Sequence, residues 1–471
     1  MKRDPHAAPA PHPAATIVLI AGLAVTAIAA RGSTAAETAH NYALGVAIGI
    51  VGSLAIDYRH NLSNLVRADL MAIGSLYFLT FFEFLLPQPE INRLVTPEEI
   101  GTACDSCLFG FAGLAIGRHL VLPTPRSLQQ TLLRPISERT LLILYTGCLI
   151  GGYFYMLLAV NFDIPSMLHY FITPRFSQPW TRGRFGDWRA LLGEVGMVLY
   201  LVPPIAGIIL ARRKDYTTGA RIYIAVTFLF TLFYGFTSGT RNLFATYLAT
   251  FIVAYAFVYR SARKLELFLV CATVGALMLT ATVVMLEFRT IGFESYWNGY
   301  REFQEKKENT TFFVDYNLYV IAKLATVFPE RYAYLGWEIP YLSVIRPIPR
   351  AVWPGKPEGL STSIEDALGV EGLTLASSFV GEAYISGGLF GVLLTGFIFG
   401  IIAGWWNQLG RSDNSPFGYL VFSSAFFAAV ISMRSMFVFT TAILPTIAAL
   451  LFGNWLISRF PNKESDKLTI I

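Results

Sequence analysis

Residues 389–406 read LFGVLLTGFIFGIIAGWW, a run without a single charged side chain. A helix needs about 20 mostly apolar residues to cross a ~30 Å hydrocarbon core, so this run predicts a transmembrane helix. Similar windows recur along a chain that is 54% apolar and only 14% charged. The sequence therefore predicts an all-α polytopic membrane protein with about twelve transmembrane helices. The expected windows are 14–30, 42–56, 70–86, 100–116, 140–160, 190–210, 222–238, 242–259, 267–286, 389–406, 419–431 and 437–456.

Basic residues give the orientation of these helices, because Lys and Arg in short loops stay in the cytoplasm. They gather on alternate loops, as at Arg59 and Arg67 or at Arg212, Arg213 and Lys214. Both termini are therefore predicted to be cytoplasmic, and the long loop 287–388 lies outside. Three parts follow: residues 1–286 with about nine spans, the large periplasmic loop 287–388 with interfacial helices, and residues 389–471 with about three spans and a cytoplasmic tail.

Two further segments bear on the fold. Residues 16–29, ending in Ala-Ile-Ala, also fit a signal peptide, but several prolines precede the run and favour a retained first helix. Residues 312–328 space their apolar side chains near the helical period, which predicts a helix lying on the membrane surface.

The four cysteines do not form a disulfide framework. Cys104 and Cys107 make a C-x-x-C inside the fourth span, without a second Cys or His pair to complete a zinc site. Packing in the core is the better interpretation, and we expect neither a metal site nor a cofactor.

Basic side chains also occur at membrane boundaries on the predicted outer face, against the positive-inside bias. Single arginines at helix ends often reach to lipid headgroups. A whole cluster on one face suits a diphosphate, since a guanidinium makes two parallel charge-assisted hydrogen bonds and keeps its proton. The candidate binding residues are Arg241, Arg289, Arg346, Arg350, Lys356 and Arg434.

Outer aromatic and acidic residues complete the candidate site. Trp353 is one of many aromatic residues in the loop whose faces suit sugar rings, although part of this set anchors at the interface. Glu382 comes just before the span 389–406, beside Gly387 and Gly388, which favour a re-entrant or broken helix. Glu382, His169 and Glu194 are the candidate bases, since moving a sugar onto a hydroxyl needs a group that takes the proton. For Glu194, a structural pair with an arginine is an equally good interpretation.

Four short motifs carry a family resemblance: TSGTRN at 237–242, IPRAVWPGKP at 348–357, GEAYISGGLFG at 381–391 and SMRSMF at 432–437. Together they resemble the oligosaccharide repeat-unit (O-antigen, Wzy-type) polymerases of bacterial inner membranes. The likeness covers mainly residues 237–437, and I-P-R-x-x-W-P-x-K-P is its most specific element.

The resemblance implies transfer of an undecaprenyl-diphosphate-linked glycan to a second lipid-linked repeat unit at the periplasmic face, with Arg241, Arg350 and Arg434 binding the diphosphate. The bilayer and the lipid-linked donor and acceptor are the expected partners. A chain-length regulator is left open, and nucleic acid is not expected.

Two alternatives remain at this point. A ligase that moves finished glycan to a different acceptor would share the spans, the loop and the arginines. A flippase or transporter is expected to place charges near the middle of the membrane and to repeat its halves. Here the acidic residues lie toward the outer ends of the spans, and the loops of the two halves differ.

Overall fold

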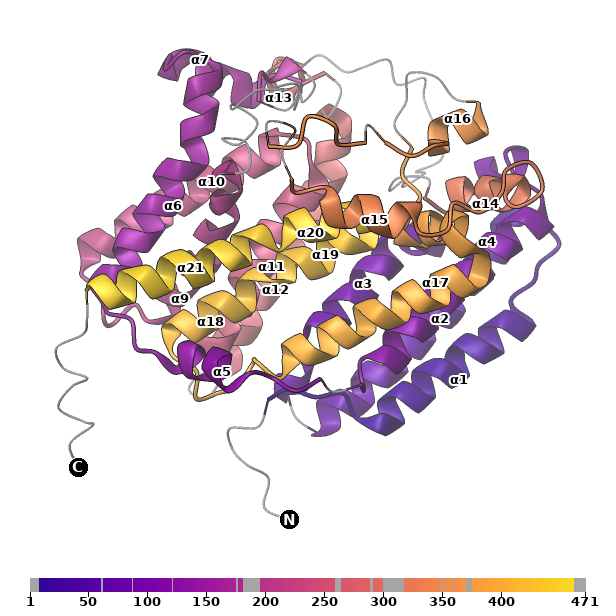
Figure 1. Cartoon of the computed structure of the whole chain (residues 1–471), viewed down its shortest axis with the longest axis horizontal. Helices are drawn as coiled ribbons and strands as arrows, with labels where there is room; N and C mark the ends of the chain where they lie inside the picture. The colour runs from indigo at the N-terminus through magenta and orange to yellow at the C-terminus, as the bar shows by residue number, and fades with distance from the viewer. Residues whose placement is uncertain are drawn as a thin grey trace.

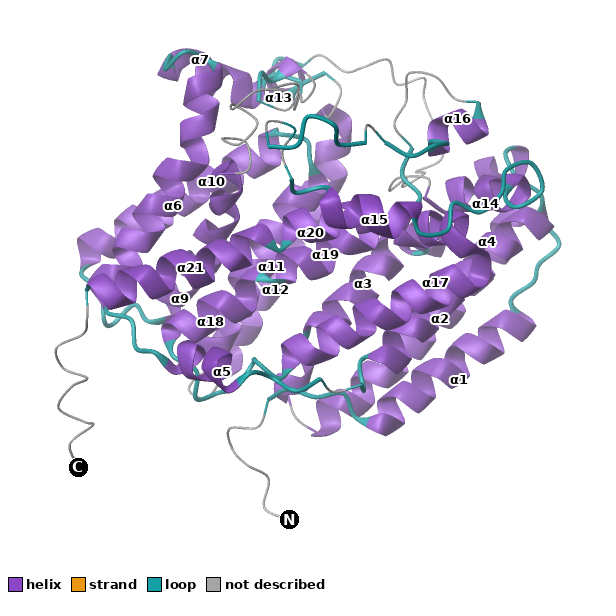
Figure 2. Cartoon of the chain, viewed as in Figure 1, coloured by secondary structure: helices purple, strands orange, loops and turns teal. Residues whose placement is uncertain are grey.

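The chain folds entirely into helices in a computed structural model (Figures 1 and 2). The structure describes residues 8–60, 62–86, 88–120, 122–174, 177–180, 195–258, 264–288, 291–299, 317–348, 350, 352–357, 359–369 and 375–460. These residues contain no strand, and eight of their helical runs are long and apolar enough to cross a membrane. The prediction of an all-α multi-pass membrane protein is confirmed in this form.

Among the described residues eight spans are long enough, and the expected number of about twelve stays a prediction. Shorter apolar helices stand in three of the predicted windows: α1 in 14–30, α3 in 70–86, and η5 with α9 in 190–210. The window 267–286 falls within α12. The helices are α1 Pro13–Ala29, α2 Ala35–His60, α3 Ala68–Thr80, α4 Pro97–Gly117, α5 Arg126–Leu133, α6 Glu138–Ala159, α7 Ile164–Ile172, α9 Val202–Ala211, α10 Thr218–Thr237, α11 Arg241–Val258, α12 Lys264–Phe288, α13 Phe293–Trp297, α14 Asn317–Val327, α15 Glu338–Ile345, α16 Ile364–Leu368, α17 Ser378–Asn407, α18 Pro416–Ser424, α19 Phe426–Arg434, α20 Phe439–Ala442 and α21 Leu444–Arg459, with 3-10 turns η1 Leu62–Leu65, η2 Phe82–Leu85, η3 Pro89–Arg93, η5 Met197–Leu201 and η6 Met436–Val438.

Local sequence fixes several helix starts. Thr96 accepts a hydrogen bond from the Glu99 N–H, and the Glu99 carboxylate accepts one from the Thr96 N–H, which is a capping box ahead of Pro97. Ser415 likewise caps α18 by accepting from the Gly418 N–H, with Pro416 in the first turn. These caps satisfy main-chain donors that a helix start leaves unpaired.

Two cores divide the molecule into two halves. One core joins α1–α4 with α14 and α17, and the other joins α6 and α9–α12 with α18 and α21. In Figure 1 the first half lies on the right, in indigo and orange, and the second on the left, in purple, pink and yellow. Helix α19 packs against both α3 and α11, so it lies where the halves meet.

Helix α17 is a hairpin rather than a continuous rod. Gly387 and Gly388 leave helical geometry, and Gly388 has φ 63° and ψ −153°. Phe379 and Phe399 have ring centroids 5.5 Å apart, whereas twenty residues of straight helix would separate them by about 30 Å. The first arm, 378–386, therefore lies back along the second arm, 389–407. The prediction of a re-entrant or broken helix at these glycines is confirmed.

Main-chain carbonyls at the turn of this hairpin accept hydrogen bonds from a neighbouring loop. Ile385 and Ser386 lose helical partners at the break, and their carbonyls accept from the N–H groups of Leu335 and Gly336, each at 2.9 Å. The hairpin is thus tied to the segment between α14 and α15.

The described part of the long loop 287–388 packs into the bundle more than the sequence predicted. Helix α14 buries six residues, including Leu318, Ile321 and Leu324, and contacts α4 and α17. It does not lie on the surface as expected for residues 312–328; positions 312–316 are outside the described residues. Helix α15 carries the exposed apolar face instead, with Trp337 81% and Val344 67% exposed.

Contacts between loops agree with the predicted sidedness. Arg212 pairs with Glu138 at 3.1 Å, and Arg134 bonds Asn454, all near ends predicted to be cytoplasmic. Lys323 pairs with Glu99 at 3.0 Å near ends predicted to be external. Cys104 and Cys107 are buried in the core of the first half, which confirms the packing interpretation.

Candidate functional site

Glu382 lies on the first arm of the α17 hairpin, and its residue is only 7% exposed. Ser435 Oγ donates to its Oε1 at 2.6 Å, and the Met436 N–H donates to its Oε2 at 2.6 Å. A buried carboxylate is costly unless hydrogen-bonded. These two donors therefore hold the Glu382 carboxylate in one orientation at the start of η6.

Arg434 ends α19, immediately before the two residues that hold Glu382. Arg241 begins α11 and is 8% exposed. The stack of Tyr200 on Phe427, with centroids 4.0 Å apart, and its edge contact with Tyr247 join α19 to α11. Both arginines thus lie at the predicted outer ends of two packed helices.

Arg346 follows α15, which packs on η6, and its charge attracts the Glu382 carboxylate. The remaining motif residues shape the loop beside it. Lys356 Nζ donates to the carbonyls of Arg346 at 2.8 Å and Ile348 at 2.9 Å, at the carboxyl end of α15. Arg350 donates to the Pro357 carbonyl at 3.2 Å, and Trp353 is half-buried. Arg350 and Lys356 therefore close the IPRAVWPGKP loop on itself.

Of the other candidate bases, His169 is not brought to Glu382. His169 lies on α7, where its Nδ1 is 3.8 Å from Glu294 of α13, and both side chains are about half exposed. Figure 1 shows α7 and α13 at the upper left, away from the α14 and α17 end. Glu194 and Arg289 lie outside the described residues.

Sequence reasoning missed the two donors, Ser435 and Met436. Ser435 follows the arginine of SMRSMF, so a small hydroxyl residue beside an outer arginine was the available signal. A main-chain donor such as the Met436 N–H leaves no trace in side-chain chemistry, and its partner is more than fifty positions away.

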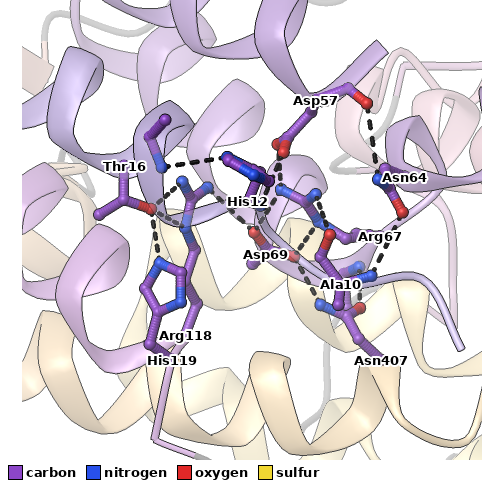
Figure 3. Close-up of polar contacts among 12 residues, drawn as sticks. Ala10, His12, Thr16, Asp57, Asn64, Arg67, Asp69, Arg118, His119 and Asn407 are labelled. Carbon is purple, nitrogen blue, oxygen red and sulfur yellow. Dashed lines mark hydrogen bonds and ion pairs between the residues drawn. The ribbon is translucent and has the colours of Figure 1, made fainter. Parts of the chain in front are cut away.

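A second polar cluster lies at the opposite ends of the helices (Figure 3). The side chains of Asp57, Arg67, Asp69 and Arg118 are all 0% exposed, with ion pairs of 2.8 Å, 2.9 Å and 3.2 Å. Asn407 donates to Asp69 at 2.6 Å. The two positive and two negative charges balance, so the cluster connects α2, α3, α4 and α17 without leaving a buried charge unpaired. Arg67 and Arg118 are therefore structural residues rather than plain loop charges.

The first helix joins this cluster through its amino-terminal end. Arg118 donates to Thr16 Oγ1 from Nε at 3.1 Å and from NH2 at 2.5 Å, and Arg67 donates to the Ala10 carbonyl at 3.2 Å. Thr16 Oγ1 is also 2.6 Å from His119 Nε2. Burial and the neighbouring Arg118 lower the pKa of His119 below its ordinary value.

Known proteins offer no guide to this arrangement. No family model matches the sequence, and the comparisons with curated proteins and with solved structures found no match.

Proposed function

We propose that the chain is a membrane glycosyltransferase that joins undecaprenyl-diphosphate-linked oligosaccharide repeat units into a polysaccharide at the outer face of the inner membrane. The observation that supports it most is the buried Glu382, held by Ser435 and Met436, which follow Arg434 in the chain, and attracted by the charge of Arg346. A fixed carboxylate that also feels the charge of a guanidinium suits a reaction that releases a diphosphate and a proton together.

In the proposed reaction the carboxylate and the arginines have different roles. A hydroxyl oxygen of the acceptor glycan attacks the anomeric carbon of the donor, and the bond from that carbon to the diphosphate oxygen breaks. The electron pair leaves with the lipid diphosphate, where Arg434 and Arg241 stabilise the charge that develops. Glu382 takes the proton of the attacking hydroxyl. A single displacement of this kind inverts the anomeric centre.

The loop 346–357 supplies the surroundings of the reaction. Lys356 holds the end of α15 through the Arg346 and Ile348 carbonyls, which fixes where Arg346 stands relative to Glu382. Arg346 is exposed and therefore accessible to a diphosphate arriving from the outer leaflet. Trp353 is partly exposed in the same loop and offers a flat face to a sugar ring.

Complementation of a deletion strain tests the proposal. We expect Arg241→Ala, Arg434→Ala and Glu382→Gln each to abolish long polymer while the proteins accumulate normally, and Arg434→Lys to fail as well because one ammonium cannot bind in the bidentate mode. Arg93→Ala is the matched control, since Arg93 is 82% exposed and pairs only weakly with Glu90 at 3.5 Å. Full-length polymer from all three of the first variants would refute the function.

A further inference from the structure

An apolar cavity of about 240 Å³ lies between α3, the second arm of α17, α19 and the helices α20–α21, beside one another in Figure 1. Its lining includes Ala72, Phe399, Ala428, Met433, Phe439 and Ile447. Small side chains on α3, α17 and α19, such as Ala72, Ala403 and Ala428, leave this space between the larger residues of the wall. Ile447 is 41% exposed, so the cavity reaches the surface of the molecule beside α21.

Three polar groups in the wall make hydrogen bonds within the protein. Ser432 Oγ donates to the Ala428 carbonyl at 2.6 Å, and Trp406 Nε1 donates to the Phe422 carbonyl at 3.0 Å. Thr446 Oγ1 accepts from Ser424 at 3.0 Å. A polar ligand would find few partners here, whereas apolar cavities of this kind stay dry and take hydrocarbon guests.

The cavity adjoins the proposed reaction site. Met433 in its wall precedes Arg434, and Ser435 and Met436 hold Glu382 just beyond. If the diphosphate of a lipid lies on Arg434, the hydrocarbon next to that diphosphate would therefore reach this cavity. A second apolar cavity, about 690 Å³ between α6, η5 and α21, has no described lining residue from α19 or η6.

We propose that the cavity between α17, α19 and α21 binds the first isoprene units of the carrier lipid and so sets the position of its diphosphate. This rests on the proposed function. An engineered cavity of 150 Å³ holds benzene, so 240 Å³ has room for roughly ten carbons, or about two isoprene units. The rest of the chain leaves beside Ile447 into the bilayer.

Photolabelling of the full-length protein in nanodiscs tests this assignment. The probe is farnesyl diphosphate carrying a benzophenone at its hydrocarbon end, and labelled peptides are read by mass spectrometry. We expect labels on α19 and α21, displaced by undecaprenyl diphosphate but not by phosphatidylglycerol. Ala428→Leu excludes roughly two methylene groups' worth of ligand and should weaken labelling about tenfold. Gly147→Leu fills the second cavity, where nothing lies within 4 Å, and should leave labelling unchanged.

The outcomes separate the cavity from the proposed function. Labels on α6 or η5, which line only the second cavity, labels lost in Gly147→Leu but kept in Ala428→Leu, or equal displacement by phosphatidylglycerol would each overturn the assignment, the last showing that ordinary bilayer lipid fills the space. Failure of the proposed function would appear elsewhere, as normal polymer from cells that lack the protein, and would leave the labelling result as it stands.

Discussion

Glu382 accepts one hydrogen bond from a side chain and one from the main chain, so mutation can separate the two. We expect Ser435→Ala to lower the rate of polymerisation about tenfold, because a hydrogen bond to a charged group contributes about 1.5–3 kcal/mol. Ser435→Thr keeps the hydroxyl and should retain most activity. The check is polymer yield per molecule of protein in the deletion strain. Equal loss in both variants would show that bulk at this position, rather than the hydroxyl, matters.

His119 offers a pH-dependent test of stability at the predicted cytoplasmic end of α4. Thr16 Oγ1 accepts from Arg118 and lies 2.6 Å from His119 Nε2, where a neutral imidazole can accept the Thr16 proton. The lowered pKa means that the folded protein binds this proton less readily than the unfolded chain. Stability should therefore fall as pH drops through about 6.5, the ordinary histidine pKa. Thermal unfolding of the purified protein between pH 8 and pH 5 measures this. The His119→Gln variant should show a smaller change of the unfolding midpoint with pH.

At the scale of the element, the α17 hairpin depends on one glycine more than on its neighbour. Gly388 has a positive φ, and an added Cβ would lie 2.8 Å from the Tyr334 hydroxyl. We expect Gly388→Ala to cost about 1–3 kcal/mol and to reduce polymerisation, since the hairpin carries Glu382. Gly387→Ala is the matched control, because its φ is −167° and nothing lies within 4 Å. The unfolding midpoint and the polymer yield of the two variants are the measurements. Equal effects of Gly388→Ala and Gly387→Ala would contradict the special role of Gly388.

Much of this element could be predicted from sequence. The apolar run 389–406 gave the second arm almost to the residue, and the paired glycines indicated the break. The glycines left open whether the helix breaks or turns back, and the contact between Phe379 and Phe399 could not be predicted, because no periodicity encodes the backbone turn that forms it. Residues 312–328 failed for a related reason: an apolar stripe looks the same whether it faces lipid or, as in α14, the helices α4 and α17.

At the scale of the molecule, the buried ionic cluster connects helices that are far apart in sequence. Asp69 alone pairs with Arg67 and Arg118 and accepts from Asn407, so it links α3, α4 and the far end of the hairpin that carries Glu382. Sequence showed these residues only as loop charges, since the match between Asp69 and a residue more than three hundred positions away appears only after folding. The bonds to Ala10 and Thr16 also make α1 part of the folded bundle.

Neutralising Asp69 should destabilise the whole bundle. Asp69→Asn keeps the shape but leaves Arg67 and Arg118 with only Asp57, and one uncompensated buried charge costs about 3–5 kcal/mol. The exposed pair Arg411–Asp413 is the control, because Asp413→Asn should cost at most about 1 kcal/mol. The thermal unfolding midpoint in detergent measures both. Adding Arg118→Gln to Asp69→Asn restores charge balance and should recover part of the loss. If the double variant is no more stable than the single one, the cluster acts through shape rather than charge balance.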